Sequence, residues 1–410
     1  MKKFFIALLA LALVAGNAFA ELSWAGYALN AVTLAAGSTE DNSDITAGNG
    51  LYGLGRIQVT ATNDDGTFGA YVRTGVNTGS GGDWGYRSYA WWKPISQFSV
   101  KVGFIGDLAI HYVVNWAFHS SGAPDTVAYG GWGRAGGWSF DGEPTGALVT
   151  LAPIEGLSVK IAVPYAGYPG PEAAEIYNHI IGQVTYDIAN VGQIGVTYQS
   201  GAGYREGATT PGDWEWVRKD PATSTVDVDE GEWKKSADTT GDPTKDPGKV
   251  FAQFHLTSVD KLDLNVGLKY TFAGEYGEDA AKKSVTPPIV AGFGAAYAVS
   301  DTFGVKACFH ADFAGSSKTG SVETKDPFKL GFDLLPYFDL SVCKVFVFMG
   351  VDVAIPDEGD DSTFDWFFNP YITKSAGGGT VYAGLQVYSD NSGADTIIKW
   401  AIPVGLDYSF

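Results

Sequence analysis

Basic side chains recur on one face of several strand-like segments of this chain. Successive side chains of a strand point to opposite faces, and each basic residue has apolar neighbours on the other face. The parity of Arg87 is ambiguous, although its place between the others favours the same group. The predicted basic row consists of Arg56, Arg73, Arg87 and Lys101. Rows of like charge attract and discriminate between ions.

A second set of charged residues belongs to the segment 106–142. This set, with one residue directly after the segment, is Asp107, Asp125, Arg134, Asp141 and Glu143. If the segment lies opposite the basic row, the two together create a transverse field that orients charged solutes. The alternative is that the segment lies elsewhere and that the arginines only interact with water.

The motifs do not favour chemistry of other kinds. GNGLYG (48–53) and GWGRAG (131–136) match G-x-G-x-x-G, but neither has the preceding parallel strand and following helix that dinucleotide binding requires. The five histidines lack the spacing of metal ligands, and no nucleophile motif occurs. We therefore predict no catalytic residue, no metal site, no cofactor and no enzymatic activity. The net charge of −19 also argues against nucleic acid as a partner.

The elements that must position these residues are β-strands. In LDLNVGLKYTF (262–272), apolar residues occupy every second position and polar or small residues occupy the positions between them. The segments 98–104, 157–165, 305–313 and 345–353 repeat this design. Cys308, within 305–313, and Cys343, directly before 345–353, fall on opposite faces. A disulfide cannot join opposite faces without distortion, so we predict two free thiols.

The first twenty residues have the three features of a secretory signal peptide. Lys2 and Lys3 precede an apolar run, and Ala18-Phe19-Ala20 is a small-x-small cleavage site. We predict a cleaved signal peptide at 1–20 and a single domain at 21–410. After residue 20 no apolar run approaches the roughly 20 residues that a membrane-spanning helix requires.

Short and long connections alternate along the whole chain. Eight short turns and nine longer loops can be counted, which gives eighteen strands, with sixteen as an alternative. A soluble β-sandwich does not require this alternation, whereas a transmembrane barrel has short periplasmic turns and longer extracellular loops. We therefore predict an all-β fold, an antiparallel transmembrane barrel of about 16–18 strands. Residues 200–249 form its long extracellular loop.

Two stretches resemble known outer-membrane proteins of diderm bacteria. The terminal strand TIIKWAIPVGLDYSF (396–410) is similar to their C-terminal strand, with a final Phe and an aromatic residue two positions earlier. The run 50–75, followed by SVKVGFIGD (99–107), resembles the second to fifth strands of general porins. The light charge of the strands is also similar in style to spirochaete barrels.

The porin resemblance has several implications for this chain. It implies location in the bacterial outer membrane, contact with its lipid, and recognition of the strand ending at Phe410 by the β-barrel assembly machinery. It also implies a homotrimer, and a segment 106–142 that folds into the barrel as a constriction loop.

We predict a water-filled channel for passive diffusion of small hydrophilic solutes and ions. One alternative is a saccharide-specific channel, in which sugar rings stack on lumen residues such as Tyr71. Another is a surface-exposed adhesin or structural barrel whose loop 200–249 binds a partner. A lipid transporter is less favoured, because the sequence contains no plug domain.

Overall fold

The computed structural model describes most of the chain after residue 20. The described residues are 21–39, 51–77, 82–83, 87–105, 145–164, 180–201, 203–205, 209–210, 214–218, 231–235, 239–240, 244–246, 248–276, 283–313, 315–356, 362–391 and 396–409. Within these ranges, no helix has both the length and the apolar character needed to cross a bilayer. The predicted signal peptide and Phe410 lie outside them.

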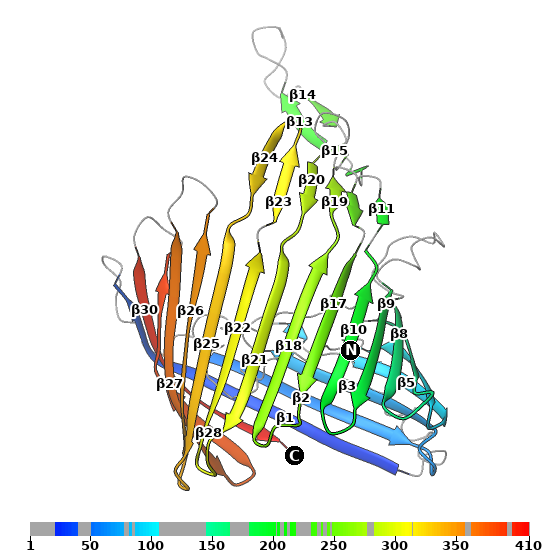
Figure 1. The fold of residues 1–410 in the computed structure, drawn as a ribbon. Helices are drawn as coiled ribbons and strands as arrows, with labels where there is room; N and C mark the ends of the chain where they lie inside the picture. The colour runs from blue at the N-terminus through cyan, green and yellow to red at the C-terminus, as the bar shows by residue number, and fades with distance from the viewer. Residues whose placement is uncertain are drawn as a thin grey trace.

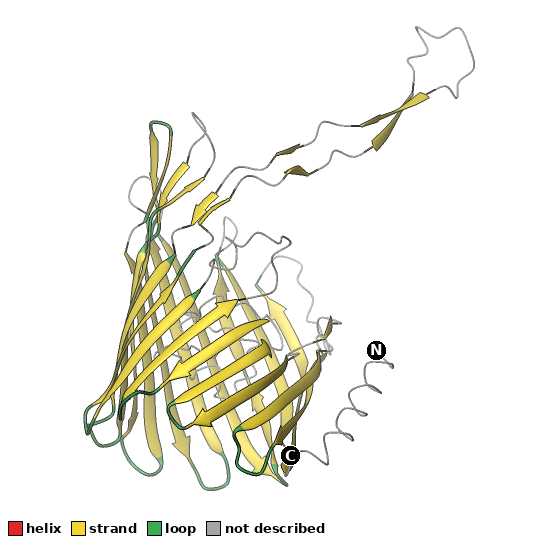
Figure 2. Ribbon diagram, turned by 90° about the vertical axis from the view of Figure 1, so that its right-hand side faces the viewer, coloured by secondary structure: helices red, strands yellow, loops and turns green. Residues whose placement is uncertain are grey.

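Eighteen antiparallel strands form a sheet that closes into a barrel (Figures 1 and 2). In order around the ring they are β1 (Glu21–Ser38), β2 (Leu51–Thr62), β3 (Phe68–Asn77), β5 (Arg87–Ile95), β6 (Phe98–Phe104), β7 (Thr145–Leu151), β8 (Leu157–Pro164), β9 (Ile181–Ile188), β10 (Gly192–Gln199), β17 (Lys249–Leu256), β18 (Leu262–Thr271), β21 (Ile289–Ala298), β22 (Phe303–Phe313), β25 (Phe328–Asp339), β26 (Lys344–Ile355), β27 (Thr363–Ala376), the pair β28 (Gly379–Gly384) and β29 (Gln386–Asp390), and β30 (Ile397–Ser409). The short β4 (Gly82–Asp83) adds to β3. The sequence-based count of eighteen is confirmed.

The barrel closes through its first and last strands. β1 pairs with β2 on one side and with β30 on the other, in a register that runs from Tyr27 opposite Ser409 to Ser38 opposite Lys399. The register shifts between Thr33 and Ala35. Closure leaves no unpaired edge, which is the condition for a sheet to reside in lipid.

Apolar side chains are exposed on the outer face of the strands and polar side chains are buried on the inner face, which is the reverse of a soluble protein. On β10 the side chains of Ile194 and Val196 are 44% and 52% exposed, whereas Thr197 and Gln199 on the other face are 1% and 2% exposed. Large apolar side chains of the other barrel strands are exposed in the same way. An outward apolar face is typical of a barrel that spans a lipid bilayer, and the opposite face lines the inside of the barrel.

Eight short turns connect the strands at one end of the barrel, as predicted. In the turn between β2 and β3, Oδ1 of Asp65 accepts hydrogen bonds from the backbone N–H and the hydroxyl of Thr67. These bonds stabilise the carboxylate and hold the pKa of Asp65 below its ordinary value of 3.8. Gly66 has a positive φ of 69°, a conformation that glycine adopts at low cost.

Besides the connection that contains β4, three of the long connections contain strands that were not predicted from the sequence. A six-stranded sheet continues beyond the barrel: β11 (Gly203–Arg205), β16 (Thr244–Asp246), β19 (Gly274–Tyr276), β20 (Lys283–Thr286), β23 (Ser316–Thr319) and β24 (Val322–Lys325). Figure 1 shows it above the rim, at the end opposite the short turns. Two further pairs, β12 (Thr209–Thr210) with β15 (Thr239–Thr240) and β13 (Trp214–Arg218) with β14 (Gly231–Lys235), lie within the predicted loop 200–249. We call the six-stranded sheet the rim sheet.

Both cysteines are free, as predicted. Cys308 is buried on the inner face of β22, and Cys343 lies in the short turn before β26.

Candidate functional site

The four predicted basic residues lie on neighbouring strands β2, β3, β5 and β6. Arg73 is opposite Gln58 on β2 and opposite Arg87 on β5, so the ambiguous parity of Arg87 is resolved in favour of the same face. That face is the inner one, because Ile57 and Val102, on the alternate positions beside Arg56 and Lys101, are exposed on the outside. Lys160 on β8 lies on the same inner face. We call Arg56, Arg73, Arg87, Lys101 and Lys160 the basic wall.

Aromatic rings lie between these cations. The ring centroids of Tyr71 and Tyr89 are 5.1 Å apart in a stacked arrangement, and the Tyr71 hydroxyl donates a hydrogen bond to Oε1 of Gln58 at 2.9 Å. The Nζ atom of Lys101 lies 5.4 Å from the ring centroid of Tyr89. The contact with the Tyr89 ring orients the Lys101 side chain before any solute binds. Solute binding therefore costs less side-chain conformational entropy than it would with a freely rotating lysine.

Carboxylates of the inner face gather on another group of strands, β22 to β27. Asp352 is directly opposite Asp365 in the register, and His310 Nε2 lies 3.9 Å from Oδ1 of Asp352. Asn391 donates a hydrogen bond to Asp365 at 2.8 Å. We call the inward carboxylates of these strands the acidic wall: Asp312, Asp333, Asp352 and Asp365.

The two walls face each other across the barrel. From β5, the pairings pass through β6, β7, β8, β9, β10, β17, β18 and β21 before they reach β22. That path takes nine steps, half of the eighteen strands in the ring. Lys306 and Lys329 also point inward on β22 and β25, so the four carboxylates of the acidic wall exceed the lysines there by two. Opposite net charge on the two walls creates a field across the lumen.

The sequence analysis missed the acidic wall. The signal was present, because Asp312 and Asp352 fall opposite the apolar parity of their strands, just as Arg56 does. The acidic residues that it proposed instead, with one arginine, are Asp107, Asp125, Arg134, Asp141 and Glu143, and all five lie outside the described residues. Among the residues that the structure describes, no group of three or more His, Cys, Asp or Glu could hold a metal ion.

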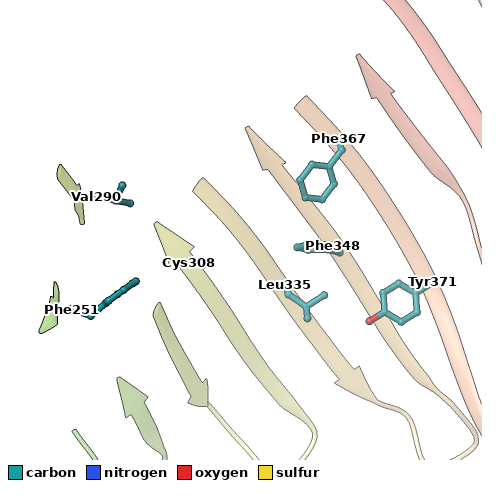
Figure 3. Packing of buried hydrophobic residues seen from close by; sticks show 7 residues of the cluster. All are labelled: Phe251, Val290, Cys308, Leu335, Phe348, Phe367 and Tyr371. Atoms are coloured by element: carbon teal, nitrogen blue, oxygen red, sulfur yellow. The ribbon is translucent and has the colours of Figure 1, made fainter. Parts of the chain in front are cut away.

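An apolar cluster also lies on the inner face, and nothing in the sequence analysis predicted it. Figure 3 shows its seven buried members, Phe251, Val290, Cys308, Leu335, Phe348, Phe367 and Tyr371. The half-buried Phe346 and Tyr388 pack against it. The rings of Phe346 and Tyr371 stack with centroids 4.7 Å apart and planes 6° apart.

No protein-family model and no curated protein sequence matches this chain. Similarity is found among solved structures of Pseudomonas aeruginosa. OccK2 (OpdF), in complex with glucuronate, has a TM-score of 0.51 at 10% identity, over 96% of this chain and 98% of that one. OpdL has a TM-score of 0.50 at 11% identity, over 95% and 99% of the two chains. The outer membrane protein OpdK has a TM-score of 0.50 at 9% identity, over 96% and 100%. At this identity the likeness shows the fold, and the predicted antiparallel β-barrel is confirmed.

Proposed function

We propose that this outer-membrane barrel is a passive diffusion channel for small hydrophilic solutes and ions. The observation that carries the proposal is the pair of oppositely charged walls on the inner face of a closed barrel. A purely structural barrel has no need of inward charges, whose desolvation is costly unless water or solute surrounds them. Their position therefore supports a lumen filled with water.

The walls also suggest how solutes are discriminated. Ions that pass between them experience a transverse field, so that anions follow the basic wall and cations follow the acidic wall. A dipolar solute aligns its own dipole with the field, whereas an uncharged apolar solute loses hydration there without compensation. The channel thus favours small polar and charged solutes.

One similar barrel, OccK2, is described in complex with glucuronate, an anion that carries a sugar ring. In the present chain, the basic wall with its interleaved tyrosines offers cations and aromatic rings at the same place. We include small carboxylates among the solutes that the proposed channel passes.

Planar-bilayer recording tests the proposal. Purified protein refolded into a bilayer should give discrete ionic current steps, with a reversal potential in a salt gradient that shifts when the basic wall is neutralised. Protein that is folded, as judged by its strand content and heat-dependent gel migration, but gives no current steps would refute the channel.

Three implications of the porin resemblance remain proposals. We propose that the segment 106–142 contributes to a constriction, and charge reversal at Asp107 or Asp125 should then change ion preference. We propose that the assembly machinery recognises the C-terminal strand, so that a chain lacking Phe410 should insert poorly in cells. Analytical ultracentrifugation in detergent tests the proposed homotrimer.

The rim sheet supports a second candidate function, that of a surface adhesin. It places six strands and the β13–β14 hairpin beyond the barrel, on the side expected to face the cell exterior. Deleting residues 206–243 should abolish attachment and leave conductance unchanged if adhesion is a function of this chain. Unchanged attachment would remove this candidate.

A further inference from the structure

The inner face of a water-filled barrel is normally polar. Part of the inner face of this barrel is aromatic instead. Seven inward aromatic residues lie on adjacent strands from β25 to β29. Their neighbours on the alternate positions, such as Phe368 and Ile372, are 40% and 47% exposed on the outside, which fixes the parity. We call these seven residues the aromatic wall: Tyr337, Phe346, Phe348, Phe367, Tyr371, Tyr382 and Tyr388.

Inward glycines allow several of these rings to lie against the barrel. A Cβ atom at Gly304 would collide with the Tyr337 ring, and one at Gly405 would collide with the Tyr382 ring. At Gly350 it would meet both Phe367 and Oδ1 of Asp333. The rings occupy the space that side chains would take at these positions. They pack against the wall and do not extend across the lumen, and four of them, Phe348, Phe367, Tyr371 and Tyr382, are only 1–3% exposed.

Three rings form a continuous row across β25, β26 and β27. Tyr337 is opposite Phe346, and Phe346 is opposite Tyr371. Their ring centroids are 6.0 Å and 4.7 Å apart, respectively. Tyr337 and Phe346 are only half-buried, so part of their surface faces the lumen, while the buried rings behind them hold the row in place.

A polar group without a partner lies in this aromatic surface. Asn369 is on the inner face of β27, two residues from Phe367 and two from Tyr371, and is opposite Phe348 in the register. Its side chain is 4% exposed, and within the described part of the chain its Oδ1 atom has no hydrogen-bond partner. A buried acceptor without a donor is unfavourable, and neighbouring side chains cover Oδ1 in this structure. A solute donor that reaches Oδ1 after a small displacement of these side chains therefore gains binding free energy.

The charged neighbours of the aromatic wall carry both signs. Lys399 is opposite Tyr388, and Lys306 is opposite Leu335 on the same inner face. Asp333 lies beside Phe367 above Gly350, and Asp365 is two residues from Phe367 on the same face. The carboxylates accept hydrogen bonds and the lysines donate them, so neither sign of solute charge is favoured alone. A solute that fits has an apolar ring face and hydroxyl groups that both donate and accept hydrogen bonds, and this combination describes a neutral saccharide.

We propose that the aromatic wall, with Asn369, is a binding subsite for neutral saccharides on the lumen side of β25 to β29. Sugar C–H groups pack on Phe346 and Tyr337, and a sugar hydroxyl donates a hydrogen bond to Oδ1 of Asn369. This inference rests on the proposed channel function, since the sugar must enter the lumen to reach the subsite.

The first experiment uses the unmodified protein in a planar bilayer. Sucrose, benzoate and benzylamine are added separately while ionic current is recorded. We expect sucrose to block the current saturably and at lower concentration than the other two. Stronger block by benzoate or benzylamine, or no saturable block by sucrose, would overturn the subsite. A total lack of ionic current would instead contradict the channel itself, so the two failures are distinguishable.

The second experiment locates the subsite with matched variants. Phe346→Leu removes an inward ring, and Phe368→Leu removes an outward ring from the adjacent strand as the control. We expect the half-blocking sucrose concentration to rise by about tenfold in the first variant and to stay unchanged in the second. Equal shifts in both would overturn the proposed location.

Asn369 provides an independent check on the same site. Asn369→Leu removes the acceptor, whereas Asn369→Asp keeps an acceptor oxygen, so only the leucine variant should lose sucrose block. The ionic conductance of each variant reports whether the barrel has folded. Identical behaviour of the two folded variants would show that Asn369 does not bind sugar.

Discussion

His310 on β22 and Asp352 on β26 meet above Gly331 on β25, with Nε2 of His310 3.9 Å from Oδ1 of Asp352. The two residues belong to strands that do not pair with each other. They come together because the glycine between them leaves the space free. The inner face of this barrel is therefore shaped by glycines as much as by the polar residues themselves.

Gly331→Ala should displace the His310 ring and Asp352 into the lumen. Because the displaced atoms are the ends of side chains, we expect a loss of unfolding free energy of about 1 kcal/mol, at the low end for overpacking, together with lower single-channel conductance. Gly55→Ala is the control, since a Cβ there meets nothing within 4 Å. An equal conductance change in both variants would contradict this description of the inner face.

Reversing charge on the basic wall should shift ion preference toward cations. Unit charges 4 Å apart in water interact by about 1 kcal/mol, so we expect Arg73→Glu with Arg87→Glu to change the cation-to-anion permeability ratio by roughly fivefold. The reversal potential in a salt gradient measures this ratio. Lys261→Glu, in an exposed periplasmic turn, should have little effect. A shift toward anions in the double variant would show that Arg73 and Arg87 do not line the permeation path.

A lysine in the outer face should destabilise the barrel according to its depth. Phe332 is 42% exposed near the middle of β25, and Phe338 is 41% exposed close to the turn. We expect Phe332→Lys to cost about 2–4 kcal/mol and Phe338→Lys about 0–1 kcal/mol. Reversible guanidinium unfolding from lipid vesicles measures both. Equal costs would show that Phe332 does not lie at mid-depth in lipid.

The two thiols should differ in reactivity. Cys343 lies half-buried in a short turn, whereas Cys308 is 2% exposed on the inner face. A water-soluble maleimide should therefore add one label to the folded barrel, at Cys343, and two labels after denaturation. Mass spectrometry counts the labels, and peptide mapping identifies the site. Two labels on the folded protein would disprove the burial of Cys308.

Thr67 should stabilise the first periplasmic turn in a pH-dependent way. Hydrogen bonds from Thr67 lower the pKa of Asp65 in the folded state, so their contribution is present above the unfolded pKa and is lost as the pH falls through the folded one. Thr67→Val should therefore destabilise the barrel more at about pH 6 than at about pH 2.5. In an Asp65→Asn background this difference should disappear, and its persistence there would assign it to other groups.

The sequence alone determined the strands and their faces. Side chains in a strand alternate with a period of two, and a barrel in lipid must place its apolar parity outward, so Arg73 and Lys101 could be assigned to the inner face without coordinates. Gly, Asn and Asp in the short turns marked the strand ends.

The rim sheet and the aromatic wall could not be predicted from the sequence, for a different physical reason in each case. The rim strands are two to four residues long and polar, so no alternation was available to detect them. On β26 the odd positions from Val345 to Val353 indicate the outward face, but the pattern of one strand does not show that Phe346 and Phe348 on the other face pack against rings of neighbouring strands. Pairing with Asn369 and Tyr371 on β27 shows it.

Closure of the barrel determines where the acidic and basic walls lie relative to each other. Asp352 and Lys101 are far apart in the sequence, and strand parity shows only that both point inward. Only the complete order of eighteen paired strands places the acidic strands half a turn from the basic ones, because position around a barrel is the sum of all the pairings between two strands and no local segment contains it.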